Sequence, residues 1–426
     1  MKSAEKLKKD ISNGLYNSIL EKIYCKKDFK KIHERYIDLI NGFCANFGSN
    51  RELSLFSAPG RTEIGGNHTD HQRGCVLAAS VNLDVIAAVS LNNENTIRLQ
   101  SEGYPLDIIN LDKLEPEMSE YNQAKALIKG VVAKFKELGY DIKGFDAYTS
   151  SNVLKGSGLS SSAAFEVLIG NILNGLFANN SVSDIEIAKI GQYAENVYFG
   201  KPCGLMDQMA SSVGGVVSID FRDNKKPLIK KIEYDFSKSG YALCIIDSGA
   251  DHADLTDEYA AIPYEMKKVA QVFGKEVLRE VDEKLFMENI AKVREKCGDR
   301  AVLRAIHFYA DNNRAILEAE ALKKGDFKEF LGIVTESGKS SYMYLQNVSV
   351  CGSSTHQAVG LVLALCDKFL ENKGAYRVHG GGFAGTVQAF VPLNMVTEFK
   401  TKIEKTIGKD CCHILSIRPV GGIRIE

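Results

Sequence analysis

Apolar residues recur at helical spacing near the start of the chain. Tyr36, Leu39, Ile40 and Phe43 fall on one face of a helix, and lysines and acidic residues occupy the positions between such apolar residues. This pattern predicts helices over residues 1 to about 50, which lead into a first strand.

The segment from residue 53 to residue 99 has a different pattern. Its β-branched content rises and its glycines cluster, which predicts strands and turns. The most apolar stretch, residues 76–91, contains Asn82 and Asp84 and is shorter than the roughly 20 residues that a membrane span needs. It predicts a buried strand, and no membrane partner is expected.

Helical and strand patterns mix in the rest of the chain. Ser183 and Glu186 have the spacing of a capping box and predict a helix that ends near Gly200. Amphipathic helices, three or four in number, are expected between residues 259 and 369, and strands should flank Gly380–Gly382. The mixture indicates the α+β class.

The chain has 426 residues, which is more than one hydrophobic core usually organises, so two domains are expected. The polar stretch 222–227 is the predicted crossing between them. This gives a first domain over residues 1–225 and a second domain over residues 226–406.

Composition and charge exclude several function classes. The 53 basic and 54 acidic side chains give a net charge of −1, so the basic excess that attracts nucleic acid is missing. The ten cysteines form no CxxC pair, and the N-terminal lysines have no apolar signal core behind them. We expect a cytoplasmic protein with no nucleic-acid partner.

A glycine- and serine-rich turn precedes an apolar run and predicts an anion-binding helix start. Backbone N–H groups at such a turn point toward a ligand at the positive end of the helix dipole, and serine hydroxyls add donors and metal ligands. The alternative is a turn that only caps a buried helix, but three consecutive serines favour phosphate binding. The residues are Gly156, Ser157, Gly158, Leu159, Ser160, Ser161 and Ser162.

The loop over residues 57–71 carries a second set of polar residues. Arg61, His68 and Asp70 provide the hydrogen-bonding groups that a polyol needs, and the glycines between them allow close approach of the backbone. A surface loop with an ordinary ion pair is one alternative. A metal site of His68, Asp70 and His71 is another, but one short loop rarely supplies three ligands.

Two acidic residues and a run of glycines complete the candidate chemistry. Glu195 lies at the edge of a predicted apolar helix face, where it either points into a cleft near a metal or remains a solvated glutamate. Asp207 follows a glycine turn among apolar neighbours, and a helix N-terminal role is its simplest interpretation. The run Gly380–Gly382 weakens a strand, which indicates close backbone approach or a tight interdomain turn.

Together these segments resemble the three motifs of the GHMP small-molecule kinases, and among these the galactokinases. The resemblance runs from about residue 45 to the C-terminus. Its marks are Ala58-Pro59-Gly60-Arg61, His68-Thr69-Asp70, Gly158–Ala163, Cys203–Gln208, His252 with Glu258-Tyr259, and Gly380–Phe383.

The resemblance implies a two-domain GHMP kinase fold. An N-terminal ribosomal-protein-like domain and a C-terminal ferredoxin-like α+β domain would enclose the active site in the cleft between them. The last strand, within about residues 407–426, would return to the first domain.

The resemblance also implies roles for individual residues. Arg61 and Asp207 would flank the anomeric hydroxyl of the sugar as the catalytic pair, and the turn over residues 156–162 would wrap the phosphates of ATP. Mg²⁺ would be held by Ser161 and Glu195. Besides the catalytic pair, the sugar contacts would be Asn67, His68, Asp70, Gly204 and Tyr259.

Two positions depart from the galactokinase pattern. Asn67 stands where galactokinases carry a glutamate, and His71-Gln72 stand where they carry a tyrosine. The usual glutamate accepts a hydrogen bond from the hydroxyl on the sixth carbon of the sugar, whereas an amide also donates and does not repel an anion.

The expected activity is ATP-dependent phosphorylation of galactose at the anomeric hydroxyl, with sugar and ATP as partners of a monomer or weak homo-oligomer. Galacturonate and N-acetylgalactosamine remain alternative substrates because of the two departures. A non-catalytic regulator that binds sugar and ATP is a further alternative, and the intact serine run, Arg61 and Asp207 argue against it.

Overall fold

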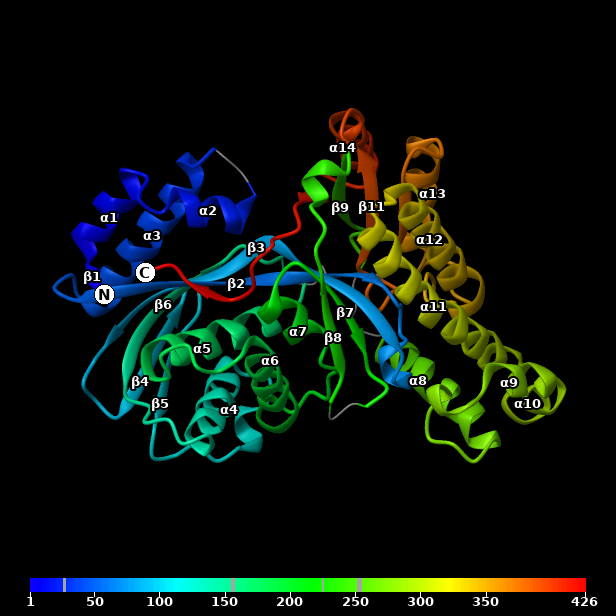
Figure 1. Cartoon of the computed structure of the whole chain (residues 1–426), viewed down its shortest axis with the longest axis horizontal. Helices are drawn as coiled ribbons and strands as arrows, with labels where there is room; N and C mark the ends of the chain where they lie inside the picture. Colours follow the sequence, from blue (N-terminus) through cyan, green and yellow to red (C-terminus); the bar gives the residue numbers. More distant parts are fainter. Residues whose placement is uncertain (26–27, 155–157, 224–225, 251–254) are drawn as a thin grey trace.

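The computed structural model spans residues 1–426 and describes all of them except 26–27, 155–157, 224–225 and 251–254 (Figure 1). Among the described residues, two β-sheets are covered by helices. The first sheet has the order β1-β2-β3-β6-β4-β5, with β13 beside β2, β7 beside β3 and β8 beside β7. Its strands are β1 (Lys2–Ser3), β2 (Glu52–Gly65), β3 (Cys75–Leu91), β4 (Thr96–Ser101), β5 (Leu106–Asn110), β6 (Phe145–Ser151), β7 (Val216–Asp220), β8 (Leu228–Ile232) and β13 (Ile423–Arg424).

The second sheet is smaller and antiparallel in every described pairing. Its order is β10-β11-β9-β12, and its central strands are buried along most of their length. The strands are β9 (Tyr241–Asp247), β10 (Ala375–His379), β11 (Thr386–Pro392) and β12 (Cys412–Leu415). Two sheets with packed helices confirm the predicted α+β class.

Helices cover both faces of the first sheet. The long central strands β2 and β3 are buried along almost their whole length, because apolar helix faces pack against them from both sides. The N-terminal helices on one face are α1 (Ala4–Ser12), α2 (Asn17–Tyr24) and α3 (Lys30–Phe47). The opposite face carries α4 (Ala124–Glu137), α5 (Ser161–Phe177), α6 (Asp184–Tyr193) and α7 (Met206–Val213).

The predicted start and end of α6 are confirmed. The Ser183 side chain accepts a hydrogen bond from the Glu186 N–H at 3.2 Å, as a helix cap should. The helix continues into a π-helical turn, η3 (Ala194–Phe199), and Gly200 ends it in the left-handed conformation.

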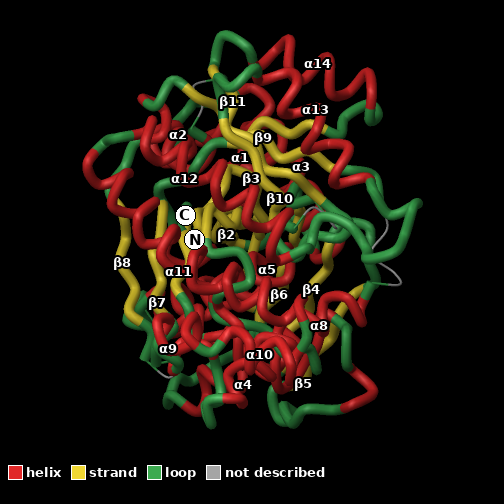
Figure 2. Tube along the Cα trace, turned by 90° about the vertical axis from the view of Figure 1, so that its right-hand side faces the viewer, coloured by secondary structure: helices red, strands yellow, loops and turns green. Residues whose placement is uncertain are grey.

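The chain after β9 holds more helices than the three or four that the sequence pattern predicted between residues 259 and 369. They are α8 (Thr256–Val272), α9 (Glu283–Glu288), α10 (Ile290–Cys297), α11 (Asp299–Lys324), α12 (Phe327–Ser340), α13 (Ala358–Leu370) and α14 (Val396–Thr406). Figures 1 and 2 show α13 and α14 beside β9 and β11, where their apolar residues share a core with the sheet. The helix α11 contacts β3 and joins the two halves of the molecule.

The chain crosses between the sheets later than the sequence pattern predicted. The predicted crossing falls between β7 and β8, and both strands belong to the first sheet, in a register that runs from Val216↔Ile232 to Asp220↔Leu228. The crossing is therefore residues 233–240. A polar hairpin turn and a polar linker have the same composition, so the pattern alone does not separate them.

The C-terminal segment crosses back to the first sheet. After β12, the Ser416 carbonyl accepts from the Asn82 N–H, and β13 pairs with β2 at Ile423↔Ser57. Both termini then lie side by side, where Lys2 forms an ion pair with Glu426 at 3.1 Å (Figure 1). No helix in the described part of the chain has the length and apolarity that a membrane crossing requires.

Candidate active site

Arg61 is held at the centre of the candidate site by strand β2. A register shift between Pro59 and Arg61 interrupts the pairing with β3, and the Arg61 N–H donates to the Leu159 carbonyl at 3.0 Å. Arg61 is 8% exposed, and its guanidinium also donates to the Gly158 carbonyl. Strand β2 therefore fixes Arg61 against the glycine- and serine-rich turn.

Asp207 lies in the first turn of α7 and forms a bidentate pair with Arg61. The distances are 2.6 Å from Nε to Oδ1 and 2.7 Å from Nη2 to Oδ2, and the Ser160 hydroxyl also donates to Oδ2. Burial disfavours the charge, but the Arg61 guanidinium and the Ser160 hydroxyl outweigh it and hold the pKa of Asp207 below its usual value. The carboxylate is ionised at neutral pH.

The turn before α5 has the geometry of an anion-binding helix start. Gly158 and Ser160 both have positive φ, of 70° and 55°, and α5 begins at Ser161. Positive φ is uncommon for serine, and such residues concentrate at functional sites. The first N–H groups of a helix have no partner within the helix, so an anion can bind them. Gly156 and Ser157 of the predicted loop lie outside the described residues.

Glu195 lies in a buried polar cluster beside α5. Its carboxylate accepts from the Ser162 hydroxyl at 3.2 Å and from the Gln208 amide at 2.8 Å, and Gln208 also donates to Glu166 at 3.0 Å. Burial and the charge of Glu195 raise the pKa of Glu166 well above its usual value, which favours the neutral form of this group.

The oxygen donors near the start of α5 fit a hard cation. Hydroxyl and carboxylate oxygens are the ligand types that Mg²⁺ prefers, and it binds few protein groups beside phosphates and water. Ser161 is the first residue of α5, but the hydroxyl in contact with Glu195 is that of Ser162. Three or more His, Cys, Asp or Glu side chains arranged to hold a metal are not found together in the described part of the chain.

The predicted sugar contacts gather next to the Arg61–Asp207 pair. A Cβ on Gly204 would lie 2.9 Å from Asp70 Oδ2, so the glycine allows this carboxylate to approach the backbone before α7. Burial lowers the pKa of Arg61, but the Asp207 carboxylate outweighs burial and raises it, and the charge of Asp70 adds to this effect from nearby. Asp70, in the loop after β2, thus lies against the backbone that leads into α7.

His68 and Tyr259 both form hydrogen bonds to carbonyl groups of the glycine run Gly380–Gly382. His68 Nε2 lies 3.0 Å from the Gly381 carbonyl, and the Tyr259 hydroxyl donates to the Gly382 carbonyl at 2.8 Å. Burial and the neighbouring His71 lower the pKa of His68 to about 4, so its ring is neutral and Nε2 donates. His68 Nδ1 is buried without a hydrogen-bond partner in the described part of the structure.

Asn67 lies beside these residues but is turned into the protein. It is fully buried, and its amide is hydrogen-bonded to Glu63, Gly380, Ser341 and Asn347. The side chain of Asn67 is therefore bound to other protein groups. The predicted site residues that the structure brings together are Arg61, His68, Asp70, Gly204, Asp207 and Tyr259.

Sequence reasoning missed the histidine that precedes the glycine run. His379 accepts from the Glu63 N–H at 3.3 Å and lies 3.0 Å from the Thr62 hydroxyl, directly after Arg61 in β2. A Cβ on Gly158 would lie 3.2 Å from its ring. The glycine run was interpreted as a place of close backbone approach or as a tight interdomain turn, and a Cβ on Gly381 would lie 2.6 Å from the Tyr259 ring. No local pattern shows that His379 forms hydrogen bonds between the two sheets.

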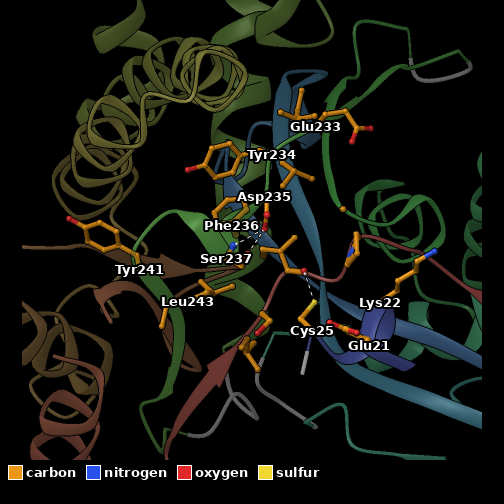
Figure 3. A pocket seen from close by; sticks show the side chains of 18 of the residues that line it. Glu21, Lys22, Cys25, Glu233, Tyr234, Asp235, Phe236, Ser237, Tyr241 and Leu243 are labelled. Carbon is orange, nitrogen blue, oxygen red and sulfur yellow. Dashed lines mark hydrogen bonds between the residues drawn. The ribbon is translucent and has the colours of Figure 1, made fainter. Parts of the chain in front are cut away.

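A cavity of about 1120 Å³ lies away from these residues, where the chain crosses between the sheets. Figure 3 shows Glu21, Lys22 and Cys25 of the N-terminal segment on one side and Tyr234 and Tyr241 on the other. Its lining residues include none of the candidate site residues.

Fold and site together define a GHMP-type kinase. Residues 126–215 match the model of the GHMP kinases N terminal domain. A mevalonate kinase structure from Methanococcus jannaschii, at 16% identity, superimposes with a TM-score of 0.61 over 86% of this chain and 98% of that chain. That likeness shows the shared fold.

More specific matches come from galactokinases. Residues 41–91 match the galactokinase galactose-binding signature. A galactokinase from Glaesserella parasuis serovar 5 is 32% identical in an alignment over 379 residues that covers 86% of this chain and 92% of the relative. The structure of Lactococcus lactis galactokinase complexed with galactose has a TM-score of 0.75 and 25% identity, over 90% of this chain and 98% of that chain. The chain belongs to the galactokinase family and is a sugar kinase, a phosphotransferase.

Proposed function

We propose that this chain transfers the γ-phosphoryl group of ATP to the anomeric hydroxyl of galactose, giving galactose 1-phosphate and ADP. The observation that carries the proposal is the meeting of the Arg61–Asp207 pair with the start of α5. Phosphoryl transfer needs a positive charge, an ionised carboxylate and an anion-binding helix start within one site, and the Arg61 guanidinium supplies the positive charge. The match to the galactose-binding signature supports the choice of sugar.

In this proposal the sugar binds beside Asp207. Asp70, His68, Tyr259 and the Gly204 backbone contact its hydroxyls. The neutral His68 ring offers Nδ1 as an acceptor, since Nε2 donates to Gly381. Asp70 is an acceptor at a point where Gly204 leaves room for it.

The phosphates of ATP bind the turn from Gly156 to Ser162. The start of α5 supplies N–H groups and the positive end of the helix dipole, and Arg61 adds a fixed positive charge nearby. Mg²⁺ would be held by Ser161 and Glu195, and when bound it would neutralise charge on the phosphates.

Asp207 and Arg61 act on the reacting hydroxyl. Asp207 is ionised and accepts a hydrogen bond from the anomeric hydroxyl, which orients the oxygen toward the γ-phosphate. As that oxygen bonds to the γ-phosphorus and the bond from the phosphorus to ADP breaks, the proton of the hydroxyl passes to Asp207. Its lowered pKa limits its strength as a base, so its main contribution is orientation and charge. Arg61 stabilises the negative charge that develops on the transferred group.

The test is ADP release from ATP with a panel of sugars at equal concentration. Galactose should give the highest kcat/KM, and the product should be phosphorylated at the anomeric oxygen. A clear preference for galacturonate or N-acetylgalactosamine would replace the proposed substrate. Binding of ATP and galactose without ADP release would refute the catalytic role.

A further inference from the structure

The Asn67 side chain uses its full hydrogen-bonding capacity inside the protein. Its Nδ2 donates to Glu63 Oε1 at 3.0 Å and to the Gly380 carbonyl at 2.7 Å. Its Oδ1 accepts from Asn347 Nδ2 at 2.9 Å and from the Ser341 hydroxyl at 3.2 Å. A primary amide has two N–H groups and two lone pairs, so no group remains for a ligand.

The backbone of Asn67 is held as tightly as its side chain. Its N–H donates to Asp311 Oδ2 at 2.8 Å, and its carbonyl lies 2.9 Å from His307 Nε2. Burial lowers the pKa of His307, so the ring is neutral and donates through Nε2 to the carbonyl. Asp311 and His307 are both fully buried residues of α11.

The partners of Asn67 come mainly from the second half of the chain. Apart from Glu63 of β2, they belong to α11, to the π-helical turn η6 (Ser341–Leu345), to the residues after that turn and to the loop between β10 and β11. Asn67 therefore connects the loop after β2 to four segments from the second half of the chain.

The residues after Asn67 depend on this connection. His68 has a left-handed backbone, with φ of 58°, and its ring donates to Gly381, the neighbour of the Gly380 carbonyl that Asn67 binds. Asp70 follows two residues later, as the first residue of the short helix η1 (Asp70–Gln72). A shift of Asn67 would move both predicted sugar contacts together.

We propose that Asn67 is a positioning residue whose amide fastens the sugar-binding loop to the glycine run Gly380–Gly381 and does not contact the sugar. The inference rests on the proposed function, since the loop must bind a sugar for its position to matter. The glutamate that galactokinases carry here cannot replace the amide in this chain. A carboxylate would face the Glu63 carboxylate and the Gly380 carbonyl without a proton to donate.

A consequence concerns recognition of the sixth carbon of the sugar. Residue 67 contributes no group to it, so preference for a hydroxyl at that carbon must come from other side chains. Variants of Asn67 should weaken turnover of galactose and of 6-deoxygalactose by the same factor.

The first test is an exchange of donor and acceptor between Asn67 and Glu63. Asn67→Asp should lower kcat/KM for galactose by about 100-fold, because buried acceptors then face each other without a donor. Adding Glu63→Gln restores a donor between them and keeps the total charge, so the buried Arg377, which donates to Glu63 Oε1, still has one carboxylate in this cluster. The double variant should regain at least about tenfold in kcat/KM relative to Asn67→Asp, and part of the lost Tm. No recovery in either quantity would overturn the proposal.

The second test compares two sugars on one variant. For Asn67→Ala, the ratio of kcat/KM for galactose to that for 6-deoxygalactose should stay within about twofold of the wild-type ratio, whatever fraction of the enzyme is folded. A fall of about tenfold or more in the ratio would mean that the amide contacts the hydroxyl at the sixth carbon. That result would contradict the proposal.

Two measurements on the wild-type protein complete the design. Turnover of galactose is measured first; its absence refutes the proposed function, and the Glu63 exchange is then judged by Tm alone. A crystal structure with galactose should show no sugar oxygen within hydrogen-bond distance of the Asn67 amide, which is about 3.2 Å. A direct contact there would overturn the inference whether or not the variants fold.

Discussion

The Arg61 guanidinium binds both carboxylate oxygens of Asp207, at 2.6 Å from Nε and 2.7 Å from Nη2. The two residues are separated by 146 positions in the chain, and β2 and the start of α7 bring them together. Bidentate geometry fixes the carboxylate plane as well as its charge, so Asp207 has one orientation toward a sugar hydroxyl.

Ser160 should support catalysis through Asp207. Ser160→Ala removes one donor to Oδ2, so the pKa of Asp207 should rise and kcat should fall by about 10- to 100-fold, as expected for a hydrogen bond to a charged group. Steady-state kinetics with sugar and ATP measure the effect. Ser211→Ala is the matched control, because this serine of α7 donates to the Pro59 carbonyl at 2.6 Å and does not contact Asp207. An equal loss of kcat in both variants would contradict the role.

Two neighbouring glutamates should differ in their effect on the metal requirement. Glu195→Gln should raise the Mg²⁺ concentration for half-maximal activity by about tenfold or more, because the proposed metal ligand loses its charge. Glu166→Gln should change that concentration little, because the raised pKa of Glu166 already favours its neutral form. Titration of Mg²⁺ at saturating ATP separates the two. Equal shifts would show that Glu195 has no special place at the metal.

Asp84 should hold the N-terminal helices to the sheet. It is fully buried, and Arg35, Arg418, Ser57 and Tyr24 all contact it. Asp84→Ala leaves the buried Arg418 without its carboxylate partner and should cost about 3 to 5 kcal/mol in the free energy of unfolding.

Asp146→Ala is the control for this stability measurement. Asp146 is equally buried, but its partners Arg51 and Arg98 are partly exposed. Water can solvate their charges when Asp146 is removed, so the free energy of unfolding should fall by less. Denaturant unfolding compares the two variants. A larger loss for Asp146→Ala would contradict the account.

Asp84 should also produce part of the acid sensitivity of the fold. Burial opposes its charge, but Arg35 and Arg418 outweigh burial and lower the pKa of Asp84 in the folded state. The folded state therefore binds fewer protons than the unfolded state, and stability contributed by Asp84 is present above about pH 3.9, the usual pKa of an unfolded aspartate. It is lost as the pH falls through the lower folded value. The Asp84→Ala variant should lose Tm less steeply than wild type over this acid range.

Local sequence patterns predicted the elements better than the contacts between them. The cap at Ser183 and the buried strand over residues 76–91 are local features, and both are present as α6 and β3. The crossing after β8 was wrongly expected at residues 222–227, because the turn of a hairpin has the composition of a linker.

The candidate site was predictable only in part. Taken alone, Asp207 suggested a helix N-terminus, and the family resemblance was needed to pair it with Arg61. The position of Asn67 could not be read from the chain, since its partners at residues 311, 341, 347 and 380 are remote in sequence. Nothing in a local pattern shows that an amide will be saturated by such partners.

The measurement that tests the central claim most directly is turnover and nucleotide affinity of Asp207→Asn. The substitution keeps the size of the side chain and removes its charge, so ADP release with galactose and ATP should fall by about 1000-fold or more. Affinity for a nonhydrolysable ATP analogue should stay within about threefold of wild type, because the helix start and Arg61 remain. Turnover at the wild-type rate would contradict the assignment of the reaction centre to Arg61 and Asp207.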